Sequence, residues 1–215
     1  MKIAYINPNS TVAMTDGIVT TAQAALPSAE IFGLTNSAGP AAIQGRADGE
    51  AAVSGLLELV PIARQRGAEV IVIACFDDTG LTQARAIADC PVIGIGQASY
   101  IMAHLLGLRF SVITSMPISV AVIEENIRQS GFAALCASVR ATELPVLVID
   151  TGRPAVLDRI GDEIARAVAE DGASCAVLGC AGMAHLKQAL ELHAGVPLID
   201  GVAASAKLAT ALTPR

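Results

Sequence analysis

Short runs of β-branched and aliphatic residues alternate with longer, helix-like segments along the whole chain. This alternation is typical of an α/β fold with mostly parallel sheets. The predicted strands are Ile3–Ile6, Ala29–Leu34, Val70–Ala74, Val92–Ile95, Phe110–Ile113, Ala137–Ala141, Ala176–Leu178 and Pro197–Ile199. The predicted helices are Thr11–Ala25, Gly49–Arg66, Gly80–Ala88, Ala98–Leu106, Ser119–Ser130, Ala155–Ala169, Met183–Leu192 and Gly201–Leu212. Ser10 and Ser119 stand where N-caps are expected.

The pattern also repeats within the chain. The segments that echo one another in order are Ile3–Ser10 and Phe110–Ser119, Ala68–Leu81 and Ala173–Leu186, and Cys90–Ser99 and Val196–Ser205. Cys75 and Cys180 are 105 positions apart (180 − 75), and Ser99 and Ser205 are 106 apart (205 − 99). A nearly constant offset predicts two pseudo-symmetric α/β halves with a site in the cleft between them. We expect the first half to comprise residues 1–97 and 205–215, and the second residues 98–204.

The composition excludes several classes of protein. Of the 215 residues, 53% are hydrophobic and only 3% aromatic, and the net charge is −6 with no basic run. Nucleic-acid binding needs clustered Lys and Arg, so no nucleic-acid partner is expected. Neither a signal peptide nor an apolar stretch of membrane-spanning length is visible, so we expect a cytoplasmic protein with no membrane partner. The ligand types are dispersed, which predicts no metal site.

Five cysteines at irregular spacing favour free thiols over a disulfide framework. Cys75 and Cys180 each follow a predicted strand, and ligands bind at the carboxyl ends of strands in open α/β sheets. Each also precedes a predicted helix, whose N-terminus would lower the thiol pKa. Two thiols facing each other from related halves could remove a proton from one face of a carbon and return one to the other. Cys90, Cys136 and Cys175 are interpreted as structural residues.

Six segments carry a resemblance to a known family. They are INPNST (Ile6–Thr11), ACFDDTGL (Ala74–Leu81), PVIGIGQA (Pro91–Ala98), RFSVITS (Arg109–Ser115), LGCAGM (Leu178–Met183) and GVPLIDGVAA (Gly195–Ala204). Together they resemble the hydantoin racemase family of the aspartate/glutamate racemase superfamily, over nearly the whole chain. The resemblance implies a pseudo-twofold α/β fold, catalytic Cys75 and Cys180, no cofactor, and a homo-oligomer. It implies a 5-monosubstituted hydantoin as substrate, with allantoin among the candidates.

A hydantoin ring offers N–H donors and C=O acceptors, so its site needs uncharged polar groups. The expected substrate-binding residues are Asn7, Asn9, Ser10, Thr11, Ile43, Gln44, Phe76, Asp77, Thr114, Ser115, Ala181 and Gly182. The chain departs from the family at Thr79, where Pro is frequent, and at Gln44 and Gln97, where Glu is frequent. These departures leave the identity of the substrate open.

Other readings of the same residues stay open. The chain could be an amino-acid racemase, a maleate isomerase or a decarboxylase of the same superfamily, or a non-catalytic small-molecule-binding protein. A carboxylate substrate would need cationic partners, which the strand-end loops lack apart from nearby Arg46. Asp77 and Asp78 suggest helix capping by one carboxylate and ligand binding by the other. The histidines at positions 104, 185 and 193 are interpreted as surface residues, with His185 at the edge of the site. Gly94-Ile-Gly96 lacks the third glycine of a dinucleotide-binding motif, so that function is rejected.

Overall fold

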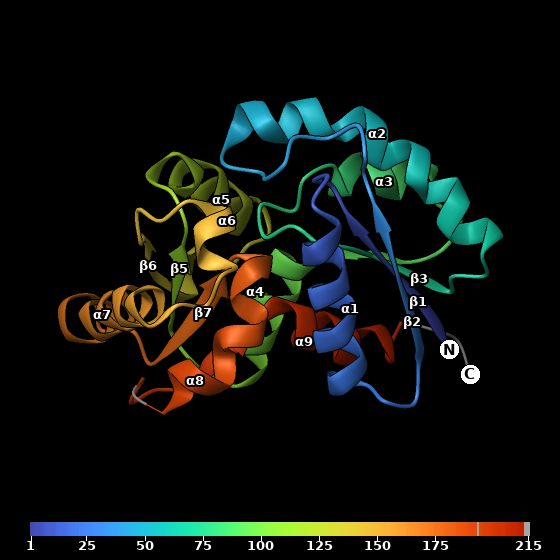
Figure 1. Cartoon of the computed structure of the whole chain (residues 1–215). Helices are drawn as coiled ribbons and strands as arrows, with labels where there is room; N and C mark the ends of the chain where they lie inside the picture. The colour runs from blue at the N-terminus through green and yellow to red at the C-terminus, as the bar shows by residue number, and fades with distance from the viewer. Residues whose placement is uncertain (193, 213–215) are drawn as a thin grey trace.

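Two four-stranded sheets, each entirely parallel, form the frame of the molecule in the computed structural model, which describes residues 1–192 and 194–212 (Figure 1). The first sheet has the order β2-β1-β3-β4 and the second the order β6-β5-β7-β8. The strands are β1 (Lys2–Asn7), β2 (Glu30–Thr35), β3 (Val70–Ile73), β4 (Val92–Gly94), β5 (Phe110–Thr114), β6 (Cys136–Ala141), β7 (Cys175–Gly179) and β8 (Leu198–Asp200). The two orders correspond strand by strand, which confirms the α/β fold with two similar halves. His193 and residues 213–215, the end of the predicted first half, lie outside the described residues.

The helices occupy the positions expected from the sequence, with small shifts at their ends. They are α1 (Val12–Ala25), α2 (Arg46–Gln65), α3 (Leu81–Ile87), α4 (Ile95–Leu105), α5 (Pro117–Gln129), α6 (Val146–Ile149), α7 (Pro154–Asp171), α8 (Lys187–Glu191) and α9 (Gly201–Ala209). Two 3₁₀ helices, η1 (Ala133–Leu135) and η2 (Ala181–Leu186), complete them. The expected Met183–Leu192 helix is thus divided between η2 and α8, and α6 had no counterpart in the prediction.

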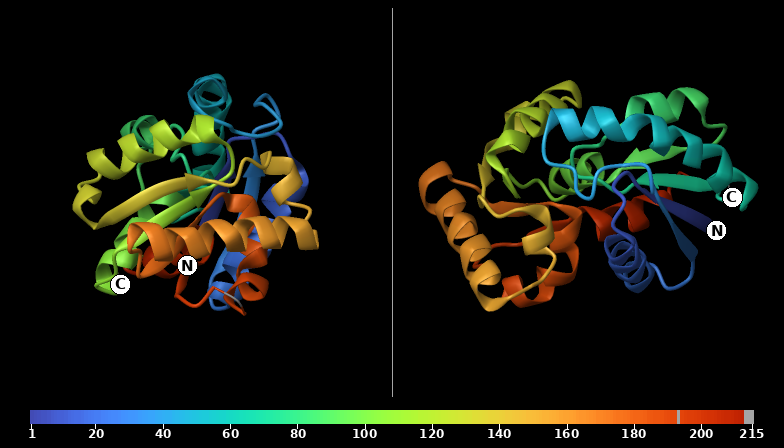
Figure 2. Two further views of the ribbon diagram at one scale, coloured as in Figure 1. Left: turned by 90° about the vertical axis from the view of Figure 1, so that its left-hand side faces the viewer. Right: turned by 45° about the horizontal axis from the view of Figure 1, so that its top comes forward.

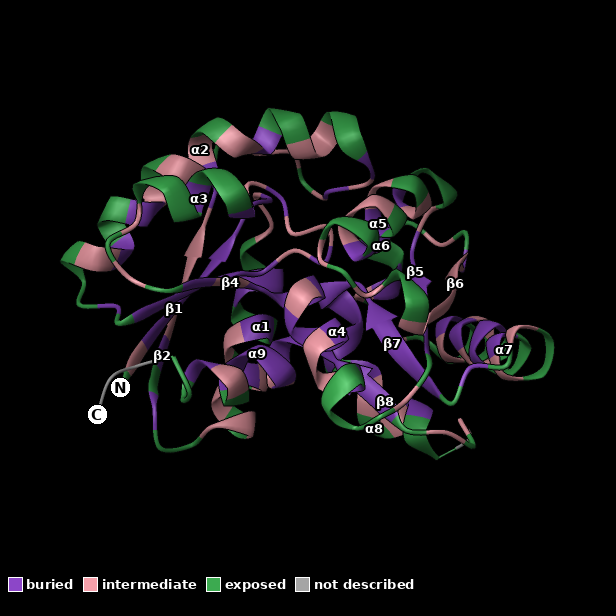
Figure 3. Cartoon of the chain, turned by 180° about the vertical axis from the view of Figure 1, so that it is seen from behind, coloured by how far each residue is buried: buried purple, intermediate pink, exposed green. Residues whose placement is uncertain are grey.

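Both faces of each sheet are covered, because alternate residues of every strand belong to different core clusters. In β1, Ile3 and Tyr5 pack with α1 and α9, whereas Ala4 and Ile6 pack with α2. Figure 2 shows α1 and α2 on opposite sides of the first sheet. Seen from behind, the strands are largely buried and the exposed residues lie on the outer sides of the helices (Figure 3). Such burial on both faces explains why strands such as β3 and β7 are continuous apolar runs, whereas the half-buried edge strands β2 and β6 include polar residues.

Helices α4 and α9 join the two halves. Each follows the last strand of one sheet and packs against the other half: α4 places Tyr100 with Phe110 of β5, and α9 places Val202 with the β1 side chains. The Tyr5 hydroxyl lies 3.0 Å from the Ser205 hydroxyl and donates to the Val202 carbonyl at 3.2 Å. This exchange of helices holds the strand ends of both sheets around a common centre. The predicted domain boundaries stay a prediction.

Among the described residues, no helix combines the length and the apolar character that crossing a membrane requires.

Candidate active site

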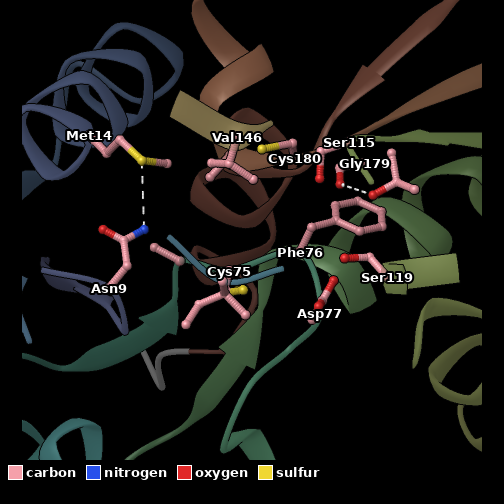
Figure 4. Close-up of a pocket in the computed structure, with 14 residues that line it drawn as sticks. Asn9, Met14, Cys75, Phe76, Asp77, Ser115, Ser119, Val146, Gly179 and Cys180 are labelled. Atoms are coloured by element: carbon pink, nitrogen blue, oxygen red, sulfur yellow. Dashed lines mark hydrogen bonds between the residues drawn. The ribbon is translucent and has the colours of Figure 1, made fainter. Parts of the chain in front are cut away.

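The two matched cysteines meet at the centre of the molecule. Cys75 follows β3 by two residues and Cys180 follows β7 directly, and both line one cavity of about 20 Å³. Figure 4 shows their sulfur atoms on facing sides of this cavity. A space of this size holds about one water molecule. The structure is therefore a closed state, and a ring-sized molecule can enter only when the walls move apart.

The cavity wall is built from the strand ends of both sheets and from segments that cross over them. Its members are Asn9, Met14, Ile43, Ala74, Cys75, Phe76, Asp77, Thr114, Ser115, Ser119, Val146, Gly179, Cys180 and Ala181. Asp77 is the one charged side chain among these wall residues, and neither Lys nor Arg is present. The wall is thus suited to a neutral polar ligand more than to a carboxylate.

Seven of the twelve expected substrate-binding residues line this cavity: Asn9, Ile43, Phe76, Asp77, Thr114, Ser115 and Ala181. The other five are Asn7, Ser10, Thr11, Gln44 and Gly182, and they lie behind the wall or beside it. The Asn7 side-chain amide donates to Asn9 Oδ1 at 2.9 Å and to Thr15 Oγ1 at 3.0 Å, so Asn7 positions Asn9.

The segment that precedes α2 closes one side of the cavity. The Thr11 hydroxyl donates to the Ala41 carbonyl at 2.7 Å, and the Ser10 N–H donates to the Pro40 carbonyl at 2.9 Å. Gln44 points away from the cavity, because its Oε1 accepts a hydrogen bond of 3.0 Å from the Val146 N–H at the start of α6. Gln44 thus joins the first half to the second.

The adjacent carboxylates Asp77 and Asp78 point in different directions. Asp78 accepts the N–H groups of Gly96 at 3.0 Å and Gln97 at 2.8 Å, so it caps α4 and not the following helix α3. A Cβ atom at Gly94 would lie 1.9 Å from Asp78 Oδ1, and one at Gly96 would lie 2.4 Å from the Phe76 carbonyl. The two glycines therefore allow the loop that follows Cys75 to approach α4 closely, which explains the Gly-Ile-Gly motif without a nucleotide.

Comparisons with known proteins agree with this geometry. The family model described as Asp/Glu/Hydantoin racemase matches residues 3–209. The chain belongs to the Asp/Glu/hydantoin racemase family.

Similar proteins of this family include a hydantoin racemase from Rhizobium meliloti, which is 43% identical over 99% of this chain and 88% of its own length. Among solved structures, the allantoin racemase from Klebsiella pneumoniae has a TM-score of 0.93 and 38% identity, covering 99% of this chain and 87% of that chain. The allantoin racemase from Pseudomonas fluorescens has a TM-score of 0.94 and 31% identity, covering 99% and 90%. The family expected from the six sequence motifs is thus confirmed.

Burial decides the electrostatics of both cysteines in this family member. It raises the pKa of Cys180 to about 12 and that of Cys75 still further, and the nearby Asp77 acts in the same direction on both. Backbone N–H groups of Gly182 and Met183 lower the Cys180 pKa, and the Thr79 hydroxyl, which donates to Cys75 Sγ at 3.5 Å, lowers that of Cys75. The expected lowering by helix N-termini was therefore wrong for the closed site, since α3 begins six residues after Cys75 and desolvation dominates.

Five wall residues were not identified from the sequence: Met14, Ala74, Ser119, Val146 and Gly179. Ser119 was expected to be an N-cap, but α5 begins at Pro117 with Met116 as its N-cap, and Ser119 is buried on the first turn. Ser10 is likewise not the N-cap of α1, a position that Thr11 takes. Ala74 and Gly179 directly precede the cysteines, a signal that could have identified them.

The remaining candidate side chains lie elsewhere. His185 is exposed in η2, and Arg46 is exposed and lines a separate cavity of about 140 Å³. Within residues 1–192 and 194–212, no group of three or more His, Cys, Asp or Glu side chains is arranged to hold a metal ion.

Proposed function

We propose that this protein is a cofactor-independent racemase of 5-monosubstituted hydantoins and that Cys75 and Cys180 are its two bases. The observation that carries the proposal is the pair of symmetry-related thiols at one small cavity whose wall has no cationic side chain. Relatives that cover nearly the whole chain are named hydantoin racemase and allantoin racemase, which supports a hydantoin ring as the substrate class. Allantoin is a hydantoin with a ureido group at C5, so it belongs to the same class.

The reaction needs one base and one acid on opposite faces of C5. One cysteine, as thiolate, takes the C5 proton, and the electron pair of the C5–H bond moves to the adjacent carbonyl oxygen. The other cysteine, as thiol, then gives its proton to the opposite face of C5, and the carbonyl forms again. The roles exchange for the other enantiomer. The two thiols together keep one proton, so no external acid or base is consumed.

The site gives less support to the alternative functions. An amino-acid racemase or a maleate isomerase must bind carboxylates, and the wall offers them no Lys or Arg. A decarboxylase needs a proton donor on one face of the substrate carbon only, which leaves one of the two cysteines without a role. A non-catalytic binding protein would bind hydantoins without exchanging their C5 proton.

Incubation of single enantiomers in deuterated water tests the proposal. A panel of 5-monosubstituted hydantoins, allantoin included, is followed by polarimetry and by NMR of the C5 proton. We expect loss of optical rotation together with deuterium uptake at C5 for at least one member. Binding without either signal across the panel would contradict the proposal and favour the binding protein.

We also propose that the protein acts in the cytoplasm as a homo-oligomer, as the family resemblance implies. Light scattering coupled to size-exclusion chromatography measures the oligomeric state, and a mass of 21.9 kDa at working concentration would contradict it.

A further inference from the structure

Asp77 breaks the pseudo-symmetry of the site. The offset that relates Cys75 to Cys180 relates Asp77 to Gly182 (77 + 105), so the second half has a glycine at the equivalent position. The Asp150 carboxyl lies beside this glycine, with its Oδ1 3.6 Å from where a Gly182 Cβ would stand, and it raises the pKa of Cys180, but Asp150 does not line the cavity. Apart from the two thiols, Asp77 is the one titratable side chain in the cavity wall. A site with one such group makes the two orientations of an asymmetric ring unequal in energy.

The carboxyl group of Asp77 has one oxygen whose hydrogen-bonding capacity is unused. Its Oδ2 atom is buried and has no hydrogen-bond partner within the described part of the chain, whereas the backbone of Gly45 hydrogen-bonds to the carboxylate. Burial raises the pKa of this carboxyl to about 7. A buried polar atom without a partner is costly, and a bound molecule that pairs with it removes that cost.

The groups around Asp77 do not favour its negative form. Asp77 raises the pKa values of four titratable groups, which are Cys75, Cys180, Asp78 and Tyr100. Asp77 also borders the outer cavity of about 140 Å³, which the exposed Arg46 and Glu50 line. Ionised Asp77 raises the pKa of both catalytic thiols. It would also repel the negative charge that develops on the carbonyl oxygen of the substrate.

We propose that Asp77 is protonated during the reaction and donates a hydrogen bond from Oδ2 to the enolate oxygen that forms beside C5. This inference rests on the proposed racemase function. The Asp77 proton stays on Oδ2 throughout, and the transferred protons remain those of the two thiols. A neutral buried carboxylic acid is an efficient donor to a developing oxyanion. The same hydrogen bond directs the C5-adjacent carbonyl towards the first half, which fixes the ring orientation.

The proposal has a specific pH signature. The active form has one thiolate, one thiol and a protonated Asp77. A second form, with two thiols and an ionised Asp77, has the same number of protons. Below about pH 7, kcat/KM should rise tenfold per pH unit, because one proton must be lost to reach this state. Above about pH 7 the curve should become level, because the main form of the enzyme then has two thiols and an ionised Asp77. This form has as many protons as the active form, so its conversion into the active form no longer depends on pH.

The experiment compares wild type with Asp77→Asn and Asp77→Ala on one hydantoin enantiomer from pH 5 to 9. Asparagine donates a hydrogen bond at every pH, so the rise in kcat/KM should continue through pH 7 to 9 in Asp77→Asn. Alanine removes the donor, so kcat should fall by about 10²–10³-fold, a typical loss for one oxyanion donor. Asp78→Asn is the control, because the pKa of the half-buried Asp78 is also raised to about 7 but its carboxylate bonds to α4 and does not line the cavity. If Asp77 causes the change of slope, the pH profile of Asp78→Asn should still become level.

Three results would overturn the proposal while leaving the racemase function intact. The first is an active Asp77→Asn whose profile becomes level at the same pH as that of wild type. The second is an Asp77→Ala variant with unchanged kcat. Thermal unfolding of every variant separates these results from misfolding, and an inactive Asp77→Asn with normal unfolding would also contradict the proposed donor. Absence of racemisation in wild type would instead refute the function itself.

Discussion

The state of the two thiols in the closed site can be measured directly. Burial raises the Cys180 pKa from its ordinary value of 9.0 to about 12. Because each pH unit is a factor of ten, Cys180 should contain ~1000-fold less thiolate at neutral pH than an ordinary cysteine. Cys75, whose pKa is raised further, should contain still less.

Alkylation by iodoacetamide between pH 6 and 10.5, followed peptide by peptide with mass spectrometry, measures this prediction. Access alone slows a buried thiol at every pH, so the informative quantity is the shape of the profile. We expect the rates of Cys75 and Cys180 to rise up to pH 10.5 without levelling. The half-buried Cys90, which is not part of the cavity, serves as the internal reference for a thiol outside it, although partial burial also raises the Cys90 pKa. Circular dichroism at each pH shows whether the protein is still folded.

Asp77→Asn should increase the alkylation rates of both cavity cysteines, because it removes a charge that raises their pKa. A profile that levels between pH 6 and 8 in the folded wild-type protein would refute this reasoning. It would mean that the backbone N–H groups outweigh desolvation and that the thiolates exist before the substrate binds.

Three further predictions concern the frame of the site. Gly96→Ala should lower the free energy of unfolding by about 3 kcal/mol in urea titrations, because the added methyl group disrupts the two hydrogen bonds with which Asp78 caps α4. A loss below about 0.5 kcal/mol would contradict the role of that cap. Gln44→Ala should raise the alkylation rates of Cys75 and Cys180 by up to about tenfold at constant pH, because the hydrogen bond between Gln44 and Val146 holds the site closed. Unchanged rates would argue against that closure. The Arg140 hydrogen bonds lower the Asp171 pKa from 3.8 to about 2. This half-buried carboxylate therefore contributes stability above pH 4 that is lost as the pH falls towards 2. Asp171→Asn should reduce this acid-dependent loss of stability by less than about 1 kcal/mol in urea titrations.

The sequence was sufficient to predict the fold because each strand is a short apolar run between turn residues. All eight strands were located, including Ala29–Leu34 and Ala137–Ala141, which correspond to β2 and β6 at one edge of each sheet. The internal repeat correctly indicated that both halves have the same strand order. Helix α6 was missed because Val-Leu-Val-Ile is a β-branched segment, and its helical form depends on tertiary packing of Val146 and Ile149.

The site was predictable mainly where its residues lie near a strand end; Ile43, eight residues after β2, is the exception. Cys75, Phe76 and Asp77 lie within four residues of the end of β3, and Cys180 and Ala181 within two residues of the end of β7, so their position in the cavity wall follows from the topology. Met14 and Val146 reach the cavity from helices, and no local motif indicates that. The direction of the thiol pKa shifts was wrong because sequence reveals a nearby helix but not how completely water is excluded.

The two-base mechanism makes one prediction that no other account of this site shares. Each cysteine removes the proton from one face of C5, so single-serine variants should exchange deuterium with opposite enantiomers. NMR in deuterated water would follow the C5 proton of each pure enantiomer with Cys75→Ser and with Cys180→Ser. We expect both variants to lose racemisation by at least about 10³-fold and to retain proton exchange for one enantiomer each, a different one in each variant. Full racemisation by either variant, or exchange of the same enantiomer by both, would contradict the account.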